Sequence, residues 1–329
     1  MKESEIRPPD LFAEYLRLSA ADAESMFDPA RREGVDCPGC GGAKHSAAFK
    51  KYGFDYVTCD TCSSLFQTPR APVAEYSEFY RDSVSAQYWA DVFLPAVIET
   101  RRTKIFRPRT ERIKALCDEK GLKPKTVIDI GAGHGVALEE WRRLDPSARL
   151  VAVEPGAALA AACRAKGIDV VETMAEDANA ATDIRGDLVT CFEVIEHVRD
   201  ALAFARSLHD LTAPGGATLI TGLGVDGFDI QLLWERSNSV SPPHHINFMS
   251  ADGFERLFKR AGFSNVEVMT PGKLDVDIVA GALARGEVDE LPRFERLLLS
   301  RGEACQQDFQ QFLARHQLSS HCWVWATRG

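Results

Sequence analysis

Apolar positions from residue 123 onward fall in short, nearly continuous runs, and the segments between these runs have helical periodicity. Such a pattern is typical of buried parallel strands joined by crossover helices. The sequence therefore predicts an α/β fold: a doubly wound, mostly parallel sheet with a ligand crevice at the carboxyl ends of its strands. The expected strands are residues 126–130, 149–154, 169–172, 187–192, 217–221 and 265–269.

Ahead of residue 123, helical segments lie on both sides of a short cysteine-containing stretch. We expect residues 1–34 to form a helical extension and residues 71–122 to form a helical linker or cap. A basic stretch at residues 101–112 is interpreted as a solvated helix face that could also meet a phosphate or carboxylate. Aromatic residues at helical spacing are more often core than binding residues, although Tyr80 could face a cofactor or acceptor. This aromatic stripe comprises Tyr76, Phe79, Tyr80, Tyr88 and Trp89.

Four of the nine cysteines form two C-x-x-C pairs, Cys37 with Cys40 and Cys59 with Cys62, with eighteen residues between the pairs. This spacing is typical of a tetrahedral zinc site, because each turn aims two thiolates at one point. We predict a zinc ribbon over residues 35–70 with a hairpin between the pairs. Four sulfur ligands leave no open coordination position, so the Zn²⁺ would be structural.

Composition limits the partners of the chain. It has 329 residues, of which 45% are hydrophobic, enough for a buried core, and its net charge is -9. An acidic chain is a poor match for nucleic acid, since phosphate binding needs a basic surface. No apolar run approaches the roughly 20 residues that span a bilayer, and the first residues lack the apolar segment of a secretory leader. We expect a cytoplasmic protein with a small-molecule acceptor and without a membrane or nucleic-acid partner.

The first predicted strand ends in a glycine-rich turn, D-I-G-A-G-H-G at residues 129–135. Val136 occupies the position where a dinucleotide fingerprint requires glycine, and the Lys-Ser/Thr ending of a P-loop is absent. Alternating glycines let the backbone bend sharply and approach a ligand. Asp129 can meet a cationic amino group, and Glu154, which ends the second strand, can accept hydrogen bonds from ribose hydroxyls. The crevice therefore suits an adenosyl group with an amino-acid tail.

In these segments the chain resembles the class I S-adenosylmethionine-dependent methyltransferases. The matching blocks are VIDIGAGHG, VAVEP, MAEDA, DLVTCFEVIEHV and LTAPGGATLIT, which cover about residues 123–270 in the expected order. The resemblance implies a Rossmann-like sheet of seven strands and S-adenosyl-L-methionine as cofactor. It implies that the glycine turn holds the methionine part, that the end of the second strand binds the ribose, and that an acidic loop flanks the adenine. The implied cofactor residues are Asp129, Gly131, Gly133, Gly135, Glu154, Pro155, Glu176, Asp177 and Glu193.

The end of the chain is expected to complete this sheet. Residues 276–317 have a helical pattern, and residues 320–327 alternate like a strand. We interpret the latter as a seventh, antiparallel strand. The methyltransferase domain would then cover residues 123–329, with a helical insertion at about 272–318.

Transfer of a methyl group from a sulfonium is an in-line displacement, so the enzyme mainly aligns the reacting atoms. A hydroxyl acceptor also needs a base within reach, and imidazole titrates near the working pH. Glu193 and Glu196 could help to bind a divalent cation, but we do not expect a catalytic metal. Which histidine is the base stays open, and His197 could equally be a residue that fixes the start of a helix. The candidate catalytic residues are His197, His244, His245 and Tyr80.

A zinc ribbon ahead of such a domain, together with the HHINF segment at 244–248, is similar to bacterial methyltransferases of sugar, polysaccharide or natural-product pathways. The leading hypothesis is methyl transfer to a hydroxyl of a saccharide or related polyhydroxylated molecule, with a histidine as general base. One alternative is C-methylation of a nucleotide-linked keto sugar, although those enzymes have a long C-terminal domain without counterpart here. RNA methylation and a non-enzymatic binding module are further alternatives.

Overall fold

The computed structural model describes all 329 residues, which divide into two compact units. One, here called the ribbon unit, comprises residues 1–98, 223–253 and 269–322. The other, here called the sheet unit, comprises residues 99–222, 254–268 and 323–329. Each unit therefore combines segments that lie far apart in the sequence. The domain boundaries expected from sequence order remain a prediction.

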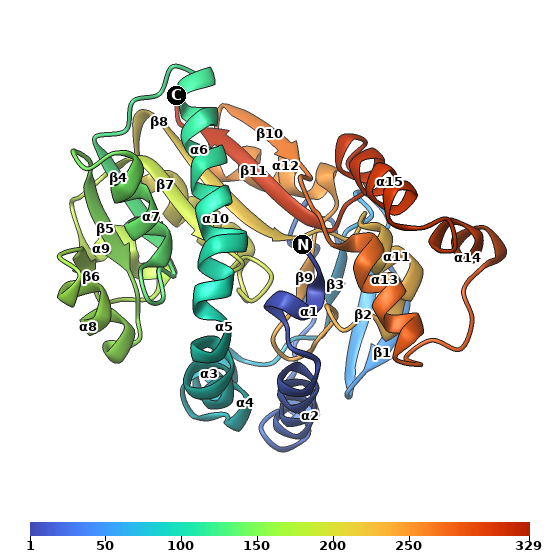
Figure 1. The fold of residues 1–329 in the computed structure, drawn as a ribbon. Helices are drawn as coiled ribbons and strands as arrows, with labels where there is room; N and C mark the ends of the chain where they lie inside the picture. The colour runs from blue at the N-terminus through green and yellow to red at the C-terminus, as the bar shows by residue number, and fades with distance from the viewer. The chain divides into compact units, whose positions relative to one another are not determined.

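The sheet unit is built on a sheet of seven strands in the order β10-β11-β8-β7-β4-β5-β6, visible in Figure 1. β4 pairs in parallel with both β5 and β7, so Ile130 lies beside Val153 on one side and Cys191 on the other. β11 runs antiparallel to β8, because the amide of Gly215 and the carbonyl of Arg328 are hydrogen bonded while Arg328 donates to Gly216. The strands are β4 (Thr126–Ile130), β5 (Arg149–Val153), β6 (Asp169–Val171), β7 (Gly186–Phe192), β8 (Thr212–Leu223), β10 (Asn265–Met269) and β11 (His321–Thr327).

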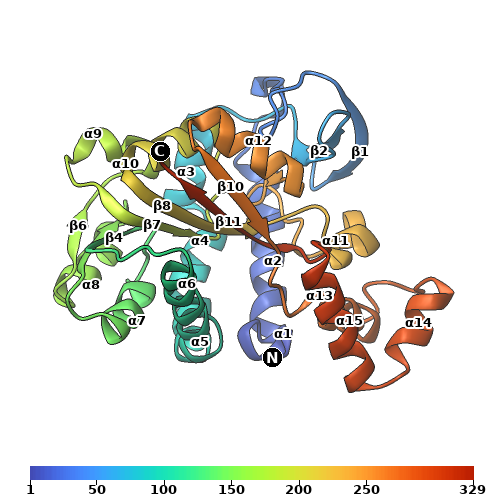
Figure 2. The same ribbon diagram turned by 90° about the horizontal axis from the view of Figure 1, so that it is seen from above.

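Helices cover both faces of this sheet. Figure 2 shows α6, α7 and α8 on one face and α9, α10 and α12 on the other. α10 illustrates why these segments are helical: the Asp200 carboxylate caps its first turn, and Phe204, Leu208 and Leu211 lie on its buried side. The helices are α6 (Arg107–Glu119), α7 (Val136–Leu144), α8 (Ala157–Ala165), α9 (Ala178–Ala181), α10 (Ala201–Leu211) and α12 (Ala251–Ala261).

The ribbon unit contains a second sheet in the order β1-β2-β3-β9. The predicted hairpin is confirmed as β1 (His45–Lys51) and β2 (Phe54–Cys59), and β3 (Leu65–Gln67) follows it. β9 (Asn247–Phe248) comes from a distant part of the chain and pairs antiparallel with β3, which places Phe248 beside Leu65. The segment that bears two candidate catalytic histidines is thus joined to the ribbon by backbone hydrogen bonds.

Aromatic side chains form the core of the ribbon unit. Phe54, Phe79 and Phe248 are fully buried in one cluster, together with Tyr56 and Tyr76. Two members of the predicted aromatic stripe, Tyr76 and Phe79, are therefore core residues. The helices are α1 (Glu3–Ile6), α2 (Pro9–Ser25), α3 (Val73–Asp82), α4 (Val84–Tyr88), α5 (Leu94–Arg101), α11 (Phe228–Leu233), α13 (Asp275–Ala284), α14 (Arg293–Leu299) and α15 (Glu303–Arg315).

The predicted strand positions are confirmed, and two of them, 126–130 and 265–269, have the predicted bounds. β8 begins at Thr212 instead of residue 217, because the glycine turn at its start forms a bulge against β7. Gly216 fits there since a Cβ would lie 2.8 Å from the Asp187 carbonyl oxygen. No helix combines the length and the apolar character that crossing a membrane requires.

Candidate functional site

The predicted glycine turn lies between β4 and α7 in the sheet unit. Gly131, Gly133 and Gly135 have φ angles of 68°, 54° and 69°, a left-handed conformation that side chains with a Cβ rarely adopt. A Cβ on Gly131 or Gly135 would press on a neighbouring side chain at 3.0 Å. A Cβ on Gly133 would meet no protein atom within 4 Å. The backbone at Gly133 is therefore open to the approach of a ligand.

Glu154, directly after β5, organises this turn. Its Oε2 accepts a hydrogen bond from the amide of Gly133 at 2.8 Å, and its Oε1 accepts one from the amide of Gly156 at 2.9 Å. The side chain is only 6% exposed. Each carboxylate oxygen has a further lone pair, so Glu154 can accept two hydroxyl protons while the amides hold it in place. Pro155, which lies between Glu154 and Gly156 in the sequence, is exposed.

Asp129 is buried at the end of β4, where its Oδ1 accepts a hydrogen bond from Thr190 at 2.8 Å. Burial raises the pKa of this carboxyl to about 7, and the Thr190 hydroxyl and Arg109 oppose the rise. A cationic ligand group beside this carboxyl would favour its ionised form.

Glu193 follows β7 and has a φ of 55°, a strained conformation for a residue with a side chain. Its Oε1 accepts hydrogen bonds from Thr221 at 2.7 Å and from Arg109 at 3.0 Å. Glu196 is fully buried, and its Oε2 has no hydrogen-bond partner. Burial and the Glu193 carboxylate raise the pKa of Glu196 well above its usual value. Such a pair is suited to share a proton or to bind a cation.

The acidic loop predicted at the adenine is a short 3₁₀ turn, Ala175–Asp177, ahead of α9. The amide of Asp177 donates to the Met174 carbonyl, and the Ser207 hydroxyl of α10 donates to the Ala175 carbonyl at 2.7 Å. Burial raises the pKa of Glu176. The Ser207 contact holds the loop against α10.

The three predicted histidines lie in two different units. His197, in the sheet unit, is half-buried in the turn after β7, and its amide donates to the Val194 carbonyl at 2.9 Å. His244 and His245 lie in the ribbon unit, just before β9.

His244 is enclosed by aromatic rings and is 4% exposed. Its ring centroid lies 4.6 Å from that of Phe79 and 5.4 Å from that of Tyr15, and its Nε2 is 3.3 Å from the Ser85 hydroxyl. Tyr80 is partly exposed and donates from its hydroxyl to the His244 carbonyl at 3.3 Å. The packed ring of His244 and the hydroxyl of Tyr80 are therefore both well placed to fix the segment that precedes β9.

His245 is half-buried, and its Nδ1 lies 2.6 Å from the Ser239 carbonyl oxygen. A carbonyl oxygen can only accept, so Nδ1 carries the proton and Nε2 is the basic nitrogen. The main chain of His245 is also fixed, because its carbonyl accepts from the Tyr56 hydroxyl at 2.6 Å and its amide donates to Ser241. This histidine has a defined tautomer and orientation.

The four predicted zinc ligands come together in the ribbon unit, with all sulfurs within 4.8 Å of one another. The Cys37–Cys62 and Cys40–Cys59 sulfur distances are both 3.5 Å. Tetrahedral zinc with Zn–S bonds of about 2.3 Å separates its sulfurs by about 3.8 Å. The backbone amides of Gly42 and Thr61 point at Cys40 and Cys59 from 3.4 Å. The cluster fits a structural Zn²⁺.

Two arginines of the basic stretch, Arg102 and Arg107, meet a carboxylate within the sheet unit. Arg102, Arg107 and Arg143 all hydrogen bond to the buried carboxylate of Glu140 on α7. Burial raises the pKa of Glu140, but these guanidinium groups outweigh burial and lower it overall. α6 is thereby tied to α7.

Sequence reasoning missed three polar residues that support the site: Arg109, Thr190 and Thr221. All three are buried. For Thr190 and Thr221, the signal in the sequence was a hydroxyl residue within an otherwise apolar strand. For Arg109, the signal was its position in the basic stretch. A polar side chain in such a position needs a buried partner, which here is Asp129 or Glu193.

Comparison with known proteins extends these observations. Residues 97–268 match the sequence model of a protein family described as "Methyltransferase domain". The chain is similar to the "Ubiquinone biosynthesis O-methyltransferase" of Psychrobacter cryohalolentis, 26% identical over 176 residues, which are 52% of this chain and 63% of the relative. The protein of the same name from Pseudomonas paraeruginosa is 29% identical over 116 residues, 33% of this chain and 49% of the relative. The match thus spans about half to somewhat under two thirds of the length of these relatives.

Two solved structures share the fold. The plantazolicin methyltransferase BamL, "in complex with triazolic desmethylPZN analog and SAH", has a TM-score of 0.50 at 13% identity. The plantazolicin methyltransferase BpumL, with a monoazolic analog and SAH, has a TM-score of 0.50 at 15% identity. Each comparison covers 77% of this chain and 94% of the other.

Proposed function

Because the chain belongs to the S-adenosylmethionine-dependent methyltransferases, we propose that it methylates a hydroxyl of a saccharide or related polyhydroxylated small molecule. The relatives named O-methyltransferases support transfer to oxygen. The saccharide acceptor is proposed from the likeness of the ribbon and the HHINF segment to sugar-pathway methyltransferases.

The residues of the sheet unit fit S-adenosylmethionine, which supplies an activated methyl group on a sulfonium. Gly133 leaves its backbone accessible, and Glu154 is held by two amides with lone pairs to spare for the ribose hydroxyls. Asp129 would meet the amino group of the methionine part. Gly131, Gly135 and the loop at Glu176 and Asp177 would complete the cofactor site. Glu193 would act by positioning Arg109 and Thr221 next to it.

His245 is the residue that we assign as general base. The observation that supports this assignment is the hydrogen bond from its Nδ1 to the Ser239 carbonyl, which fixes the tautomer in which Nε2 is the proton-accepting nitrogen. His244 and Tyr80 act as positioning residues in this proposal. The His244 ring packs against the Phe79 ring, and the Tyr80 hydroxyl donates to the His244 carbonyl. His197 remains the second candidate for the base.

Zinc is assigned to the ribbon as a structural ion bound by Cys37, Cys40, Cys59 and Cys62. It would hold β1, β2 and β3 in place, and β9 pairs with β3 directly after the histidines. The proposed ion thereby supports the position of His245.

Substitution of the histidine tests the proposed base. We expect His245→Gln to lower turnover about 10² to 10⁴-fold, the usual contribution of a general base. S-adenosylhomocysteine affinity should stay within about twofold, since His245 is not among the cofactor residues. His45→Gln, an exposed histidine on β1, is the matched control. If His197→Gln and not His245→Gln abolishes turnover, the base is in the sheet unit.

The acceptor and the methylated atom need a separate measurement. Methyl-¹³C-labelled cofactor, incubated with saccharide acceptors, should give a methoxy carbon in the product. The same reaction in deuterated water distinguishes the alternatives, because C-methylation beside a carbonyl exchanges a carbon-bound hydrogen whereas O-methylation does not. Exchange at an acceptor carbon, or a methyl group bound to carbon, would replace the O-methyl assignment.

A further inference from the structure

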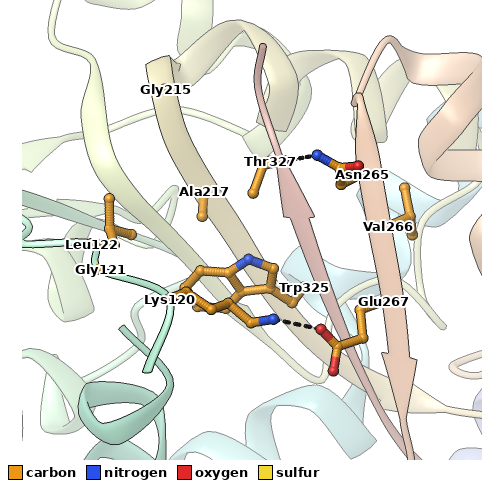
Figure 3. Close-up of a pocket in the computed structure, with 10 residues that line it drawn as sticks. All are labelled: Lys120, Gly121, Leu122, Gly215, Ala217, Asn265, Val266, Glu267, Trp325 and Thr327. Atoms are coloured by element: carbon orange, nitrogen blue, oxygen red, sulfur yellow. Dashed lines mark hydrogen bonds and ion pairs between the residues drawn. The ribbon is translucent and has the colours of Figure 1, made fainter. Parts of the chain in front are cut away.

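A cavity of about 460 Å³ lies within the sheet unit, at the edge where the parallel strands begin, and its two charged side chains are paired with each other. Figure 3 shows the ion pair between Lys120 and Glu267, and the hydrogen bond that the Asn265 amide donates to the Thr327 hydroxyl. The cysteine cluster of the ribbon unit differs, because polar groups from a distant part of the chain are bonded to it.

Ser64 connects the cysteine cluster to that distant segment. It is fully buried, its Oγ lies 3.2 Å from the Cys62 Sγ, and the same Oγ accepts a hydrogen bond from the Ser250 amide at 3.1 Å. A cysteine that binds zinc is deprotonated, so its sulfur can only accept a hydrogen bond. The Ser64 hydroxyl, which has one proton to donate and lone pairs to accept, therefore donates to the Cys62 thiolate.

Ser250, which belongs to the ribbon unit, extends this connection to the first turn of α12. Its Oγ accepts a hydrogen bond from the Gly253 amide at 2.9 Å, as an N-cap residue does, and donates to the Cys62 carbonyl. The beginning of a helix carries a partial positive charge, and four thiolates around one zinc ion leave a net negative charge. The turn thus favours the metal-bound cluster by its dipole as well as by its hydrogen bonds.

Gly253 lets both cysteine turns come close to this helix start. A Cβ on Gly253 would lie 2.2 Å from the Ser64 Oγ, and a Cβ on Gly39, which lies between Cys37 and Cys40, would lie 2.9 Å from the Gly253 Cα. Gly253 does not have a positive φ, so the backbone conformation itself does not require glycine there. The missing side chain instead serves the contact with the cluster.

We propose that Ser64 is a positioning residue that stabilises the zinc-bound thiolate of Cys62 and couples the metal to the order of residues 247–253. This role rests on the structural Zn²⁺ proposed above. While the hydroxyl donates to the thiolate, its oxygen presents a lone pair to the Ser250 amide. β9 and the segment of His245 precede Ser250 in the chain, so metal binding and the order of the histidine segment stabilise each other.

Zinc affinity, measured on the full chain by competition with a chromophoric chelator, tests the role of the hydroxyl. Ser64→Ala should weaken zinc binding about 10 to 100-fold, the usual effect of losing an outer-shell partner. Ser77→Ala, which removes an exposed hydroxyl on α3, is the matched control and should bind zinc as tightly as the wild type. In metal-loaded Ser64→Ala, the Ser250 amide should also exchange its hydrogen faster, because it has lost its acceptor. Wild-type zinc affinity in Ser64→Ala, or an unchanged exchange rate at Ser250, overturns the proposal.

Gly253→Ala tests the coupling from the distant segment. The added methyl group presses on the Ser64 hydroxyl and should weaken zinc binding to a similar extent, although alanine favours a helix more than glycine does. Gly34→Ala, near Cys37 but with no atom within 4 Å of the new Cβ, should leave zinc binding unchanged. In cadmium-substituted protein, the ¹¹³Cd resonance should move in Ser64→Ala and Gly253→Ala and stay in place in Gly34→Ala. Wild-type zinc affinity in Gly253→Ala contradicts the coupling, whereas a wild type that binds no zinc removes the metal assignment and this role with it.

Discussion

The two units of this protein build their functional groups in different ways. In the sheet unit, Asp129 lies near the carboxyl end of β4 and Glu154 directly follows the neighbouring parallel strand β5, so strand register brings them to one edge. In the ribbon unit, His245 is held by Ser239 and Tyr56, and the strand after it pairs with β3, from a segment far away in the sequence. The comparison teaches that a site at the ends of adjacent parallel strands can be predicted from local pattern. A site assembled by long-range antiparallel pairing cannot.

Loss of one zinc ligand is expected to have the largest effect, and it acts on the ribbon unit. Cys59→Ser should abolish zinc binding, measured as metal per chain. It should also unfold the ribbon, because structural zinc contributes about 10–16 kcal/mol to zinc-finger peptides. Turnover should fall with it, since β9 loses the ribbon strand with which it pairs. Cys305→Ser, outside the cluster, is the control. Full zinc occupancy in Cys59→Ser would contradict the four-cysteine assignment.

Loss of the Glu154 charge should affect the sheet unit through cofactor affinity. Glu154→Gln places an amide where two backbone N–H groups donate, and it weakens the acceptors for the ribose. We expect about 10 to 100-fold weaker S-adenosylhomocysteine binding, since hydrogen bonds to charged groups contribute about 1.5–3 kcal/mol. Glu172→Gln, exposed just after β6, should bind normally. Unchanged calorimetric affinity in Glu154→Gln would remove Glu154 from the cofactor site.

The pH dependence of cofactor binding should be the smallest of these effects. The pKa of Asp129 is about 7 because the carboxyl is buried, and only its ionised form attracts an ammonium group. Affinity should therefore be constant above about pH 7 and fall by up to about tenfold per pH unit below it. Asp129→Asn should flatten this part of the profile, while Asp169→Asn, an exposed residue on β6, should not. A wild-type affinity that stays constant or rises as the pH falls from 7 to 6 would contradict the role of Asp129.

The sequence predicted the sheet unit more fully than the ribbon unit for physical reasons. Continuous apolar runs marked β4, β5 and β7, and the alternating glycines marked a turn that the positive φ angles of Gly131, Gly133 and Gly135 require. The cysteine spacing predicted the metal cluster because a C-x-x-C turn is local.

The joining of β3 to β9 could not be predicted in this way. β9 has two residues, too few to show an alternating pattern, and its partner lies near the opposite end of the sequence. The same limit applied to the histidines. Their positions in the sequence made all three histidines candidates for the general base. The hydrogen bond to Ser239, which defines the tautomer of His245, is visible only in the structure.

Calorimetric titration of the full chain with S-adenosylhomocysteine tests the central claim most directly, which is that the glycine turn and Glu154 form a cofactor cradle. We predict one binding event per chain, weakened at least tenfold by Gly133→Val, which adds a branched side chain at a φ of 54° where the backbone is open to a ligand. Circular dichroism of the variant should stay unchanged. Absence of binding to the wild type, or equal affinity in a folded Gly133→Val, would contradict the account.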